Sequence, residues 1–237
     1  MFSPQYLLLL AFLAAPSFAA PPDAFAQWVP NGWKLIDQSE GDLNRDGIDD
    51  VVLVTEETNP ANFKKKPEES LGPNIQNLNP RRLIILLRSS SGLKEILRRD
   101  DLLPSENTED MGCLDDPLAN GGVSIARGNL VIVLQDSRSC GSYGVVTEKF
   151  TFRTRGTRFQ LIGYDRSESS RSTGERSEYS TNYLTGKKKI TTGVNDFKEF
   201  KEKVSWKRLP AMRAFFLDEI SLYCDSADPA QKDSWCQ

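Results

Sequence analysis

The stretch Gly41–Val54, GDLNRDGIDDVVLV, places a run of acidic residues and one glycine directly before a run of branched aliphatic residues. The run Val51–Thr55 predicts a short buried β-strand, since β-branched side chains favour extended backbone. In the acidic run, oxygen-bearing side chains recur at alternate positions, and Gly47 permits a sharp bend that a Cβ would hinder. The stretch therefore predicts a tight polar loop that leads into the first strand of a β-rich fold.

The oxygen-bearing side chains of this loop predict a calcium site. Calcium takes about six to eight oxygen ligands at ~2.3–2.6 Å, and alternate residues of a tight loop can turn toward a common centre. The predicted ligands are the side chains of Asp42, Asn44, Asp46 and Asp50 and the backbone carbonyl of Ile48. The alternative is an acidic turn in which the same side chains only accept hydrogen bonds from the loop backbone.

The spacing is not that of an EF-hand, because the twelfth position counted from Asp42 is Leu53 and not a bidentate glutamate. The pattern D-x-N-x-D-G-x-x-D before a strand instead resembles the calcium loops of FG-GAP and VCBS-type repeats, found in integrin-like β-propellers and many secreted bacterial proteins. The resemblance covers Asp42–Val54 and implies the ligands named above. Because the motif occurs once and a propeller needs several blades, we expect only a partial propeller-like repeat. The remaining sequence looks like that of exported bacterial proteins and implies no activity.

The N-terminus predicts export. Residues 1–19 carry no charged side chain, and their apolar core, Tyr6–Ala15, is shorter than the ~20 residues that a membrane-spanning helix needs. Small residues at Ser17 and Ala19 predict a signal peptide that is cleaved after Ala19. Cleavage one residue later and a buried N-terminal helix are the alternatives.

Beyond this leader we expect a single β-rich domain over residues 20–224 and a polar C-terminal tail over residues 225–237. No later segment is apolar enough for a transmembrane segment, so the expected location is periplasmic or secreted. The net charge of −3 and the pI near 5.3 argue against nucleic acid as a partner, because that binding depends on neutralising phosphates. The oligomeric state stays open.

All four cysteines follow the predicted leader, and an even number in an exported chain predicts structural disulfides. Three pairings are possible. Proximity in the sequence favours Cys113 with Cys140 and Cys224 with Cys236. Free or reactive thiols are the alternative.

Alternating and β-branched runs predict an antiparallel meander sheet or a sandwich. In Val145–Thr154 the apolar Phe150 and Phe152 share one face, while Thr151 and Arg153 share the other, as in a half-buried antiparallel strand. The predicted strands are Val51–Thr55, Arg82–Arg88, Leu93–Arg98, Val123–Ala126, Leu130–Gln135, Val145–Thr154, Arg158–Tyr164, Glu178–Leu184 and Lys188–Thr192.

One or two helices are predicted near the C-terminus. Asn195 or Asp196 can cap a first short helix, whose apolar residues would be Phe197, Phe200 and Val204.

Pro210 suits the first position of a second helix. Its apolar stripe would consist of Met212, Phe216, Ile220 and Tyr223.

Two long segments, Thr58–Pro80 and Tyr164–Ser180, lack apolar periodicity and are predicted to be loops. The first holds four prolines and many asparagines, so it cannot be a strand or helix throughout. Long structureless connections are uncommon and are usually functional or disordered. Both segments are therefore either binding loops or mobile surface loops.

The absence of histidine excludes Ser-His-Asp and Cys-His catalysis and His-ligated catalytic zinc. We therefore expect a non-enzymatic, exported, calcium-stabilised β protein that binds a macromolecular partner, either a protein or a glycan. One alternative is a periplasmic inhibitor or immunity protein that blocks a toxic enzyme. Another is a carboxylate-dependent hydrolase of cell-wall or sugar substrates, for which the loop carboxylates are Glu106, Glu109, Asp110, Asp115 and Asp116.

Overall fold

The computed structural model describes residues 22–199 and 201–222, and the chain is mostly β. Its strands are β1 (Trp33–Gly41), β2 (Asp50–Glu57), β3 (Phe63–Lys65), β4 (Ile75–Asn77), β5 (Arg81–Ser89), β6 (Gly92–Leu103), β7 (Gly122–Ala126), β8 (Asn129–Asp136), β9 (Gly144–Arg155), β10 (Arg158–Ser170), β11 (Glu175–Asn182), β12 (Lys187–Asn195) and β13 (Lys203–Arg208). Two 3-10 helices, η1 (Pro22–Trp28) and η2 (Pro60–Asn62), complete the regular structure. The predicted antiparallel β fold is confirmed.

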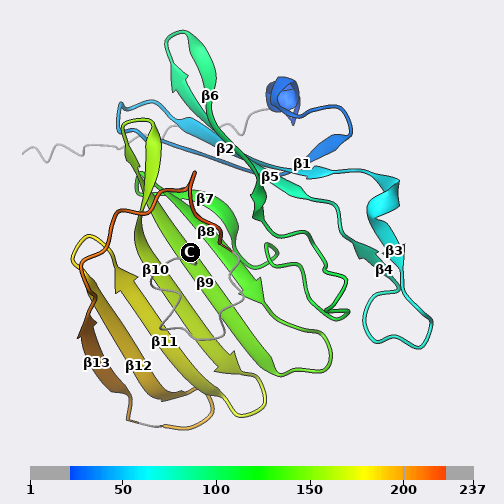
Figure 1. Cartoon of the computed structure of the whole chain (residues 1–237), viewed down its shortest axis with the longest axis vertical. Helices are drawn as coiled ribbons and strands as arrows, with labels where there is room; N and C mark the ends of the chain where they lie inside the picture. The colour runs from blue at the N-terminus through cyan, green and yellow to red at the C-terminus, as the bar shows by residue number, and fades with distance from the viewer. Residues whose placement is uncertain (1–21, 200, 223–237) are drawn as a thin grey trace, which may run out of the picture.

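The strands form three antiparallel sheets (Figure 1). A four-stranded sheet has the order β1-β2-β5-β6, and a seven-stranded sheet has the order β13-β12-β11-β10-β9-β8-β7. The third sheet is the hairpin of β3 and β4. In the large sheet each strand pairs with its neighbour in sequence, so this part of the chain is a meander.

The two larger sheets share a hydrophobic core. Figure 1 shows the four-stranded sheet crossing the β7 side of the seven-stranded sheet. One cluster joins apolar residues of the four-stranded sheet, here called the small sheet, to apolar residues of the seven-stranded sheet, here called the large sheet. It includes Val52, Val54, Leu83 and Ile85 from the small sheet and Leu130, Ile132, Phe150, Phe152 and Leu161 from the large sheet. Burial of Phe150 and Phe152 confirms the inward face predicted for their strand.

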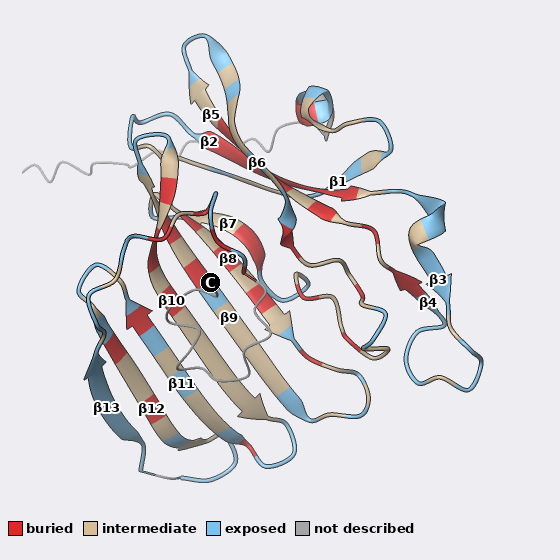
Figure 2. Cartoon of the chain, viewed as in Figure 1, coloured by how far each residue is buried: buried red, intermediate tan, exposed pale blue. Residues whose placement is uncertain are grey.

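The small sheet is also covered on its other face. Phe25 of η1 packs there against Val51, Leu53, Ile84 and Leu86. Strands that are buried on both faces are apolar at consecutive positions, which explains the uninterrupted aliphatic runs VVLV and LIIL. Figure 2 shows buried residues along β2 and β5 and exposed residues along β13.

The predicted C-terminal helices are wrong, since no α-helix occurs within the described residues. The segment expected as the first helix instead enters β13, which pairs with β12. Asn195 does not cap a helix there. Its side chain accepts a hydrogen bond from the N–H of Phe197 at 2.9 Å and donates to the carbonyl of Thr173 at 3.0 Å, so it closes a turn. Phe200 lies outside the described residues.

The segment after Pro210 is extended because it adds to the end of β10. Leu161 N–H donates to the carbonyl of Phe215 at 2.9 Å, and Leu217 N–H donates to the carbonyl of Phe159 at 2.9 Å. Phe215 and Leu217 are buried and Phe216 between them is not, which is the alternation of a strand. Of the predicted stripe, Met212 and Ile220 still pack on the core, and Tyr223 lies outside the described residues.

Both segments predicted as loops contain strands. Tyr164–Ser180 forms the ends of β10 and β11 and their turn, so the loop prediction is wrong there. Thr58–Pro80 contains η2, β3 and β4. Strand β1 was not predicted, and it pairs with β2 along its whole length, with one register shift.

Other predictions fall on residues that the structure does not describe. These are the signal peptide over residues 1–19, the tail over residues 225–237, and the pairing of Cys224 with Cys236. Within the described ranges, every helix lacks the length and apolar character that crossing a bilayer requires.

Candidate functional site

The predicted calcium loop connects β1 to β2, and its bends are built from two residues with positive φ, Arg45 at 66° and Gly47 at 87°. The Asp42 carboxylate accepts hydrogen bonds from the backbone N–H groups of Arg45 at 2.5 Å, Asp46 at 3.1 Å and Gly47 at 2.9 Å. Asn44 Oδ1 accepts from the same Asp46 N–H at 2.9 Å. The side-chain oxygens of Asp42 and Asn44 therefore lie together over the loop.

Asp46 joins this group through its side chain. Its Oδ2 accepts a hydrogen bond from Asn44 Nδ2 at 2.8 Å, and its Oδ1 accepts from the Ile48 N–H at 2.8 Å. The loop thus shows the side-chain-to-backbone bonds of an acidic turn, and it also gathers three of the predicted ligand side chains. Asp42 Oδ2, Asn44 Oδ1 and both carboxylate oxygens of Asp46 each accept one of these hydrogen bonds. Each keeps a second lone pair, so the three side chains have the donor chemistry that a hard cation prefers.

Asp50 occupies a different position. It is fully buried at the start of β2, where its two oxygens accept the N–H groups of Leu43 and Arg88, both at 2.9 Å. These bonds fasten the loop to the end of β5. Within the described residues, no three Asp, Glu, Cys or His side chains gather as a metal-binding group. A calcium site here would depend on the Asn44 side chain and on backbone carbonyls such as that of Ile48 in addition to carboxylates.

A buried ion-pair network, which we call the polar clamp, connects the four-stranded sheet to β4 and to the loop that contains Asp116. Arg81 on β5 and Glu56 on β2 are only 3% and 2% exposed, and Arg81 Nε donates to Glu56 at 2.9 Å. The Arg81 guanidinium also binds Asp116 through two bonds of 2.6 and 2.8 Å. Lys34 and Asn77 donate to the remaining oxygen of Glu56 at 2.8 and 3.0 Å. Each buried charge of the clamp therefore has a partner.

The clamp changes the acidity of its carboxyl groups. Burial alone would raise the pKa of Glu56, but hydrogen bonds from Lys34, Arg81 and Asn77 outweigh it and hold the pKa below its ordinary value. Burial likewise opposes ionisation of Asp116, and its bonds to Arg81 and to the Leu118 N–H bring its pKa below the ordinary value. Both groups are therefore ionised in the folded protein at neutral pH.

Asparagine side chains extend the clamp to the hairpin of β3 and β4. Asn77 Oδ1 accepts the backbone N–H of Asn79 at 3.1 Å, and Asn107 Oδ1 accepts the N–H of Asn77 at 2.8 Å. Asn79 Oδ1 accepts from Asn59 and Asn62. The many asparagines of this segment thus satisfy backbone groups that no sheet partner reaches, and they hold the base of the hairpin in one position.

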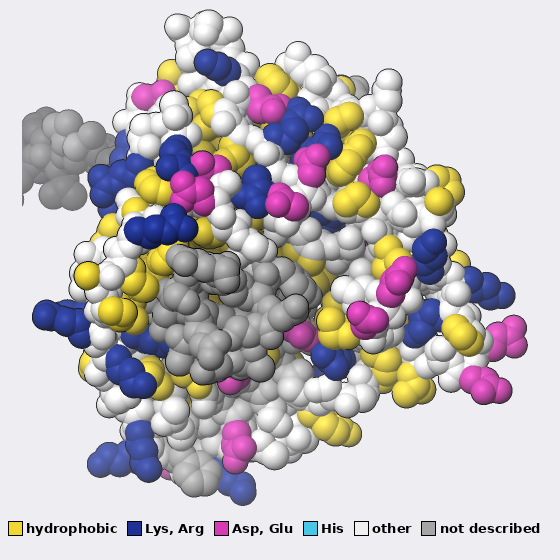
Figure 3. Space-filling model, in the orientation of Figure 1, with side chains coloured by type: hydrophobic (Ala, Val, Ile, Leu, Met, Phe, Trp, Pro, Cys, Tyr) yellow, Lys and Arg dark blue, Asp and Glu magenta, His cyan; other side chains and the backbone are white. Residues whose placement is uncertain are grey.

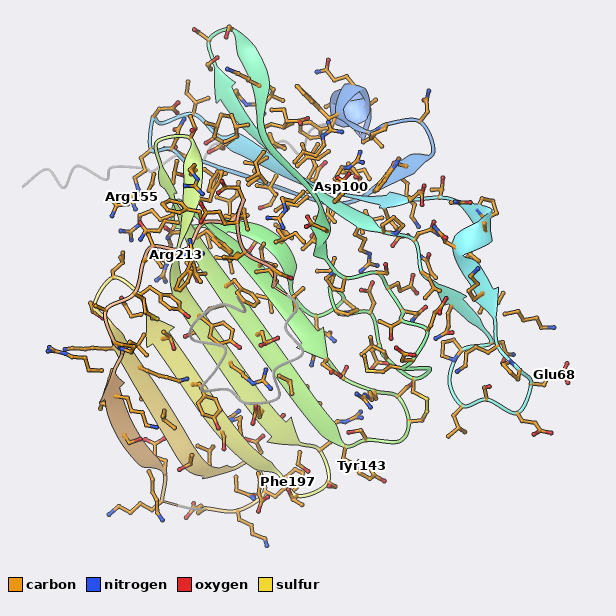
Figure 4. The ribbon with its side chains drawn as sticks, viewed as in Figure 1. Glu68, Asp100, Tyr143, Arg155, Phe197 and Arg213 are labelled. Carbon is orange, nitrogen blue, oxygen red and sulfur yellow. A yellow bond between two sulfur atoms is a disulfide. The ribbon has the colours of Figure 1, made fainter. Side chains whose placement is uncertain are left out.

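The hairpin carries exposed apolar side chains. Phe63 is 45%, Leu71 70% and Ile75 60% exposed. The pairing of Phe63 with Asn77 and of Lys65 with Ile75 puts Phe63 and Ile75 on one face, since residues two apart share a face. Figure 4 shows the β3–β4 loop projecting from the molecule, with Glu68 at its outer end. Lys66 ties this loop to the carbonyl of Gly112 at 3.1 Å.

The disulfide of Cys113 and Cys140 confirms that predicted pairing, with the Cα atoms 5.5 Å apart. Ser139 N–H donates to the Cys113 carbonyl at 2.9 Å beside it. The carboxylates singled out from the sequence divide into two groups around this loop. Glu106, Asp115 and Asp116 accept hydrogen bonds from Asn77, Ser137 and Arg81 respectively, whereas Glu109 and Asp110 are exposed.

A second polar cluster lies on the core-side face of the large sheet and was not predicted. The Tyr164 hydroxyl donates to Glu148 Oε1 at 2.5 Å, and Arg166 donates to Glu148 at 2.9 Å and to Glu168 at 2.7 Å. Burial and the adjacent Glu148 charge raise the pKa of Tyr164 above its ordinary value. The period-two spacing of Tyr164, Arg166 and Glu168 places the three side chains on one face of a strand. The segment lacks apolar periodicity and is therefore predicted from the sequence to be a loop.

Comparisons with protein-family models, with curated proteins and with solved structures found no match to this chain. The resemblance to FG-GAP and VCBS-type repeats therefore rests on residues 42–54.

Proposed function

We propose that this chain is an exported, calcium-stabilised β protein that binds a partner protein through the β3–β4 hairpin and performs no catalysis itself. The observation that carries the proposal is the exposure of Phe63, Leu71 and Ile75 on one projecting hairpin. Scattered exposed apolar residues are normal on protein surfaces. Here three of them lie on a single projecting element whose base is fixed.

The polar clamp makes the hairpin suitable for binding. An interface loses affinity when it must order flexible segments, at about 0.5–1.5 kcal/mol for each immobilised side chain. The asparagine bonds and the Lys66 contact already hold the hairpin and its loop in place. Apolar anchors on a pre-organised loop favour a protein surface with apolar pockets over a glycan.

The same geometry favours an inhibitor or immunity protein as the second candidate. A rigid projecting hairpin with apolar side chains on its strands and in its loop can enter the cleft of a target enzyme and fill it. The hydrolase alternative has no such support, because Glu106, Asp115 and Asp116 are already used in structural hydrogen bonds.

Calcium is proposed as a structural ion held by Asp42, Asn44 and Asp46. Support comes from the joint placement of their oxygens and from the positive φ of Arg45 and Gly47, which wraps the loop around them. A divalent cation would offset the repulsion between the two carboxylates and stiffen the connection from β1 to β2. The proposed resemblance to one blade of a propeller is supported by the four-stranded antiparallel sheet β1-β2-β5-β6, in which the β3–β4 hairpin is an insertion between β2 and β5.

Export is proposed from the leader and agrees with the Cys113–Cys140 disulfide, since such bonds persist in oxidising compartments. The corresponding location is the periplasm or the cell exterior.

The binding proposal is tested by a triple variant, Phe63→Ala, Leu71→Ala and Ile75→Ala. Cross-linking in the exported fraction of the source cells, followed by measurement of Kd with the purified partner, should show binding by the wild type and at least about tenfold weaker binding by the variant. The matched control replaces exposed apolar residues elsewhere by alanine, at Ile36, Tyr143 and Leu184. Equal partner affinity in the triple variant and the wild type would refute the hairpin assignment, and a wild type that binds a glycan but no protein would favour the glycan.

A further inference from the structure

The edges of the two larger sheets are protected to different degrees. At the β7 edge, β1 covers the backbone, since Ser39 Oγ accepts the Ile125 N–H at 2.9 Å and Asp37 accepts the Val123 N–H at 3.4 Å. At the β6 edge the pairing with β5 is interrupted by two register shifts. Bulges and covering groups of this kind prevent further strand pairing. The pairing of β13 with β12 is regular over all six residues, and no hydrogen bond from another described residue covers the outer backbone groups of β13.

The register shows which backbone groups of β13 point outward. The hydrogen bond from Leu209 N–H to the Gly186 carbonyl, at 2.9 Å, identifies these two as a hydrogen-bonded pair. Such pairs alternate along an antiparallel ladder, so the N–H and C=O groups of Val204, Trp206 and Arg208 face away from β12. None of these groups has a backbone hydrogen bond to another described residue beyond the ladder.

The side chains at this edge are exposed. All six residues of β13 are exposed, and Trp206 is exposed to 64%. Val204, Trp206 and Arg208 lie on one face of the sheet, because they alternate along the strand. Among the described residues, the strand therefore combines unpaired backbone donors and acceptors with a large aromatic side chain that is mostly exposed.

The charge at this edge is positive. Lys187, Lys189, Lys203, Lys207 and Arg208 form no salt bridge with any described residue, although the chain as a whole carries a net charge of −3. Figure 3 shows Lys and Arg side chains at the lower left, on the side where β12 and β13 lie in Figure 1. Unpaired cations along a strand edge attract an acidic partner and repel a second cationic one.

We propose that β13 binds an extended acidic segment of a partner protein, which adds to the large sheet as a further strand. Free N–H and C=O groups at strand spacing can form hydrogen bonds with the backbone of an extended peptide. A glycan or a nucleic acid has no comparable row of donors and acceptors to pair with them. A second copy of this chain is disfavoured, because two β13 edges would bring their cations together. The site is separate from the β3–β4 hairpin, which lies on the opposite side of the molecule (Figure 1), and it does not depend on the function proposed above.

The register predicts the partner sequence. In an antiparallel addition, acidic residues lie opposite Arg208, Lys207 and Lys203, and apolar residues lie opposite Trp206 and Val204. A blocked peptide Glu-Glu-Val-Thr-Val-Glu satisfies this pattern and serves as the probe. A peptide with lysine in place of each glutamate is its charge control.

Isothermal titration of the full protein with these peptides tests the proposal. We expect the acidic peptide to bind at low salt, the lysine peptide to bind at least about tenfold more weakly, and added salt to weaken binding. N-methylation of the acidic peptide at the alternate residues that face β13 keeps its charge but removes its hydrogen-bond donors. This change should also weaken binding at least about tenfold.

The matched protein variants are Val204→Pro and Val204→Thr. Val204 directs its N–H outward, so proline there leaves the β12 ladder intact and blocks only the free edge; it should abolish peptide binding, whereas threonine should retain it. Absence of binding by the wild type at low salt would overturn the proposal. So would equal binding of the N-methylated peptide or of an anionic oligosaccharide, which would show attraction by charge alone. A wild-type dimer that Val204→Pro dissociates would instead identify a second copy as the occupant.

Discussion

The variant Arg81→Met should destabilise the protein strongly, because it removes the central cation of the polar clamp. Three guanidinium hydrogen bonds disappear, one to Glu56 and two to Asp116. Glu56, with 2% exposure, then retains only Lys34 and Asn77 as partners. Removing one member of a buried ion pair costs about 3–5 kcal/mol in the free energy of unfolding. For a chain of this size the melting temperature should fall by about 6–20 °C.

Urea denaturation followed by circular dichroism at neutral pH measures this change. The control is Arg98→Met, which removes a partly exposed ion pair with Glu95 and should cost no more than about 1 kcal/mol. Hydrogen exchange provides a local measurement, because Arg81→Met should accelerate exchange of the β4 amides that the clamp holds. If Arg81→Met destabilises the protein no more than Arg98→Met, the clamp does not stabilise the fold as we argue.

Three further predictions concern the loop, the disulfide and the carboxyl groups. Calcium at about one hundred times its Kd should raise the free energy of unfolding by about 2.7 kcal/mol. EGTA should reverse this increase, and calcium should not stabilise the variant Asp46→Ala. Equal melting curves with calcium and with EGTA would exclude the site. Replacing Cys113 and Cys140 by serine should cost about 3.5 kcal/mol for the loop of 27 residues, and non-reducing peptide mapping should recover the two cysteines linked. Glu56 and Asp116 have lowered pKa values in the folded state, so their stabilisation is complete above their ordinary values of 4.5 and 3.8 and is lost as the pH falls further. A urea midpoint that stays constant from neutral to acid pH would contradict this prediction.

The central strands could be predicted from the sequence because burial there leaves a simple pattern. The runs VVLV and LIIL are buried on both faces, and Phe150 and Phe152 alternate with polar residues on a strand that is buried on one face. The Cys113–Cys140 pairing was also predictable, since the two cysteines are near each other in the sequence.

Polar strands escaped prediction because their side chains are stabilised by ion pairs and hydrogen bonds, which leave no apolar periodicity in the sequence. The ends of β10 and β11 carry few apolar residues, and Arg166 there is paired with both Glu168 and Glu148. The polar clamp is a similar case, because Arg81 lies 25 residues from Glu56 and 35 from Asp116. No local pattern indicates such a contact.

The C-terminal segment was mispredicted because its spacing fits two periods. Apolar residues at Phe216 and Ile220 satisfy a helix, whereas Phe215 and Leu217 satisfy a strand, and the open end of β10 selects the strand. Because the apolar spacing places Val204 in a helix, strand β13 and its open edge were not predicted from the sequence.

The packing of η1 limits how far the amino terminus can be shortened. Phe25 covers the aliphatic face formed by Val51, Leu53, Ile84 and Leu86. A protease that removed Pro22–Trp28 would leave this face in contact with water, and a contiguous aliphatic surface promotes aggregation. Any cleavage of the chain that preserves its solubility must therefore lie before η1, and cleavage within η1 would yield a chain that self-associates although all its strands are present.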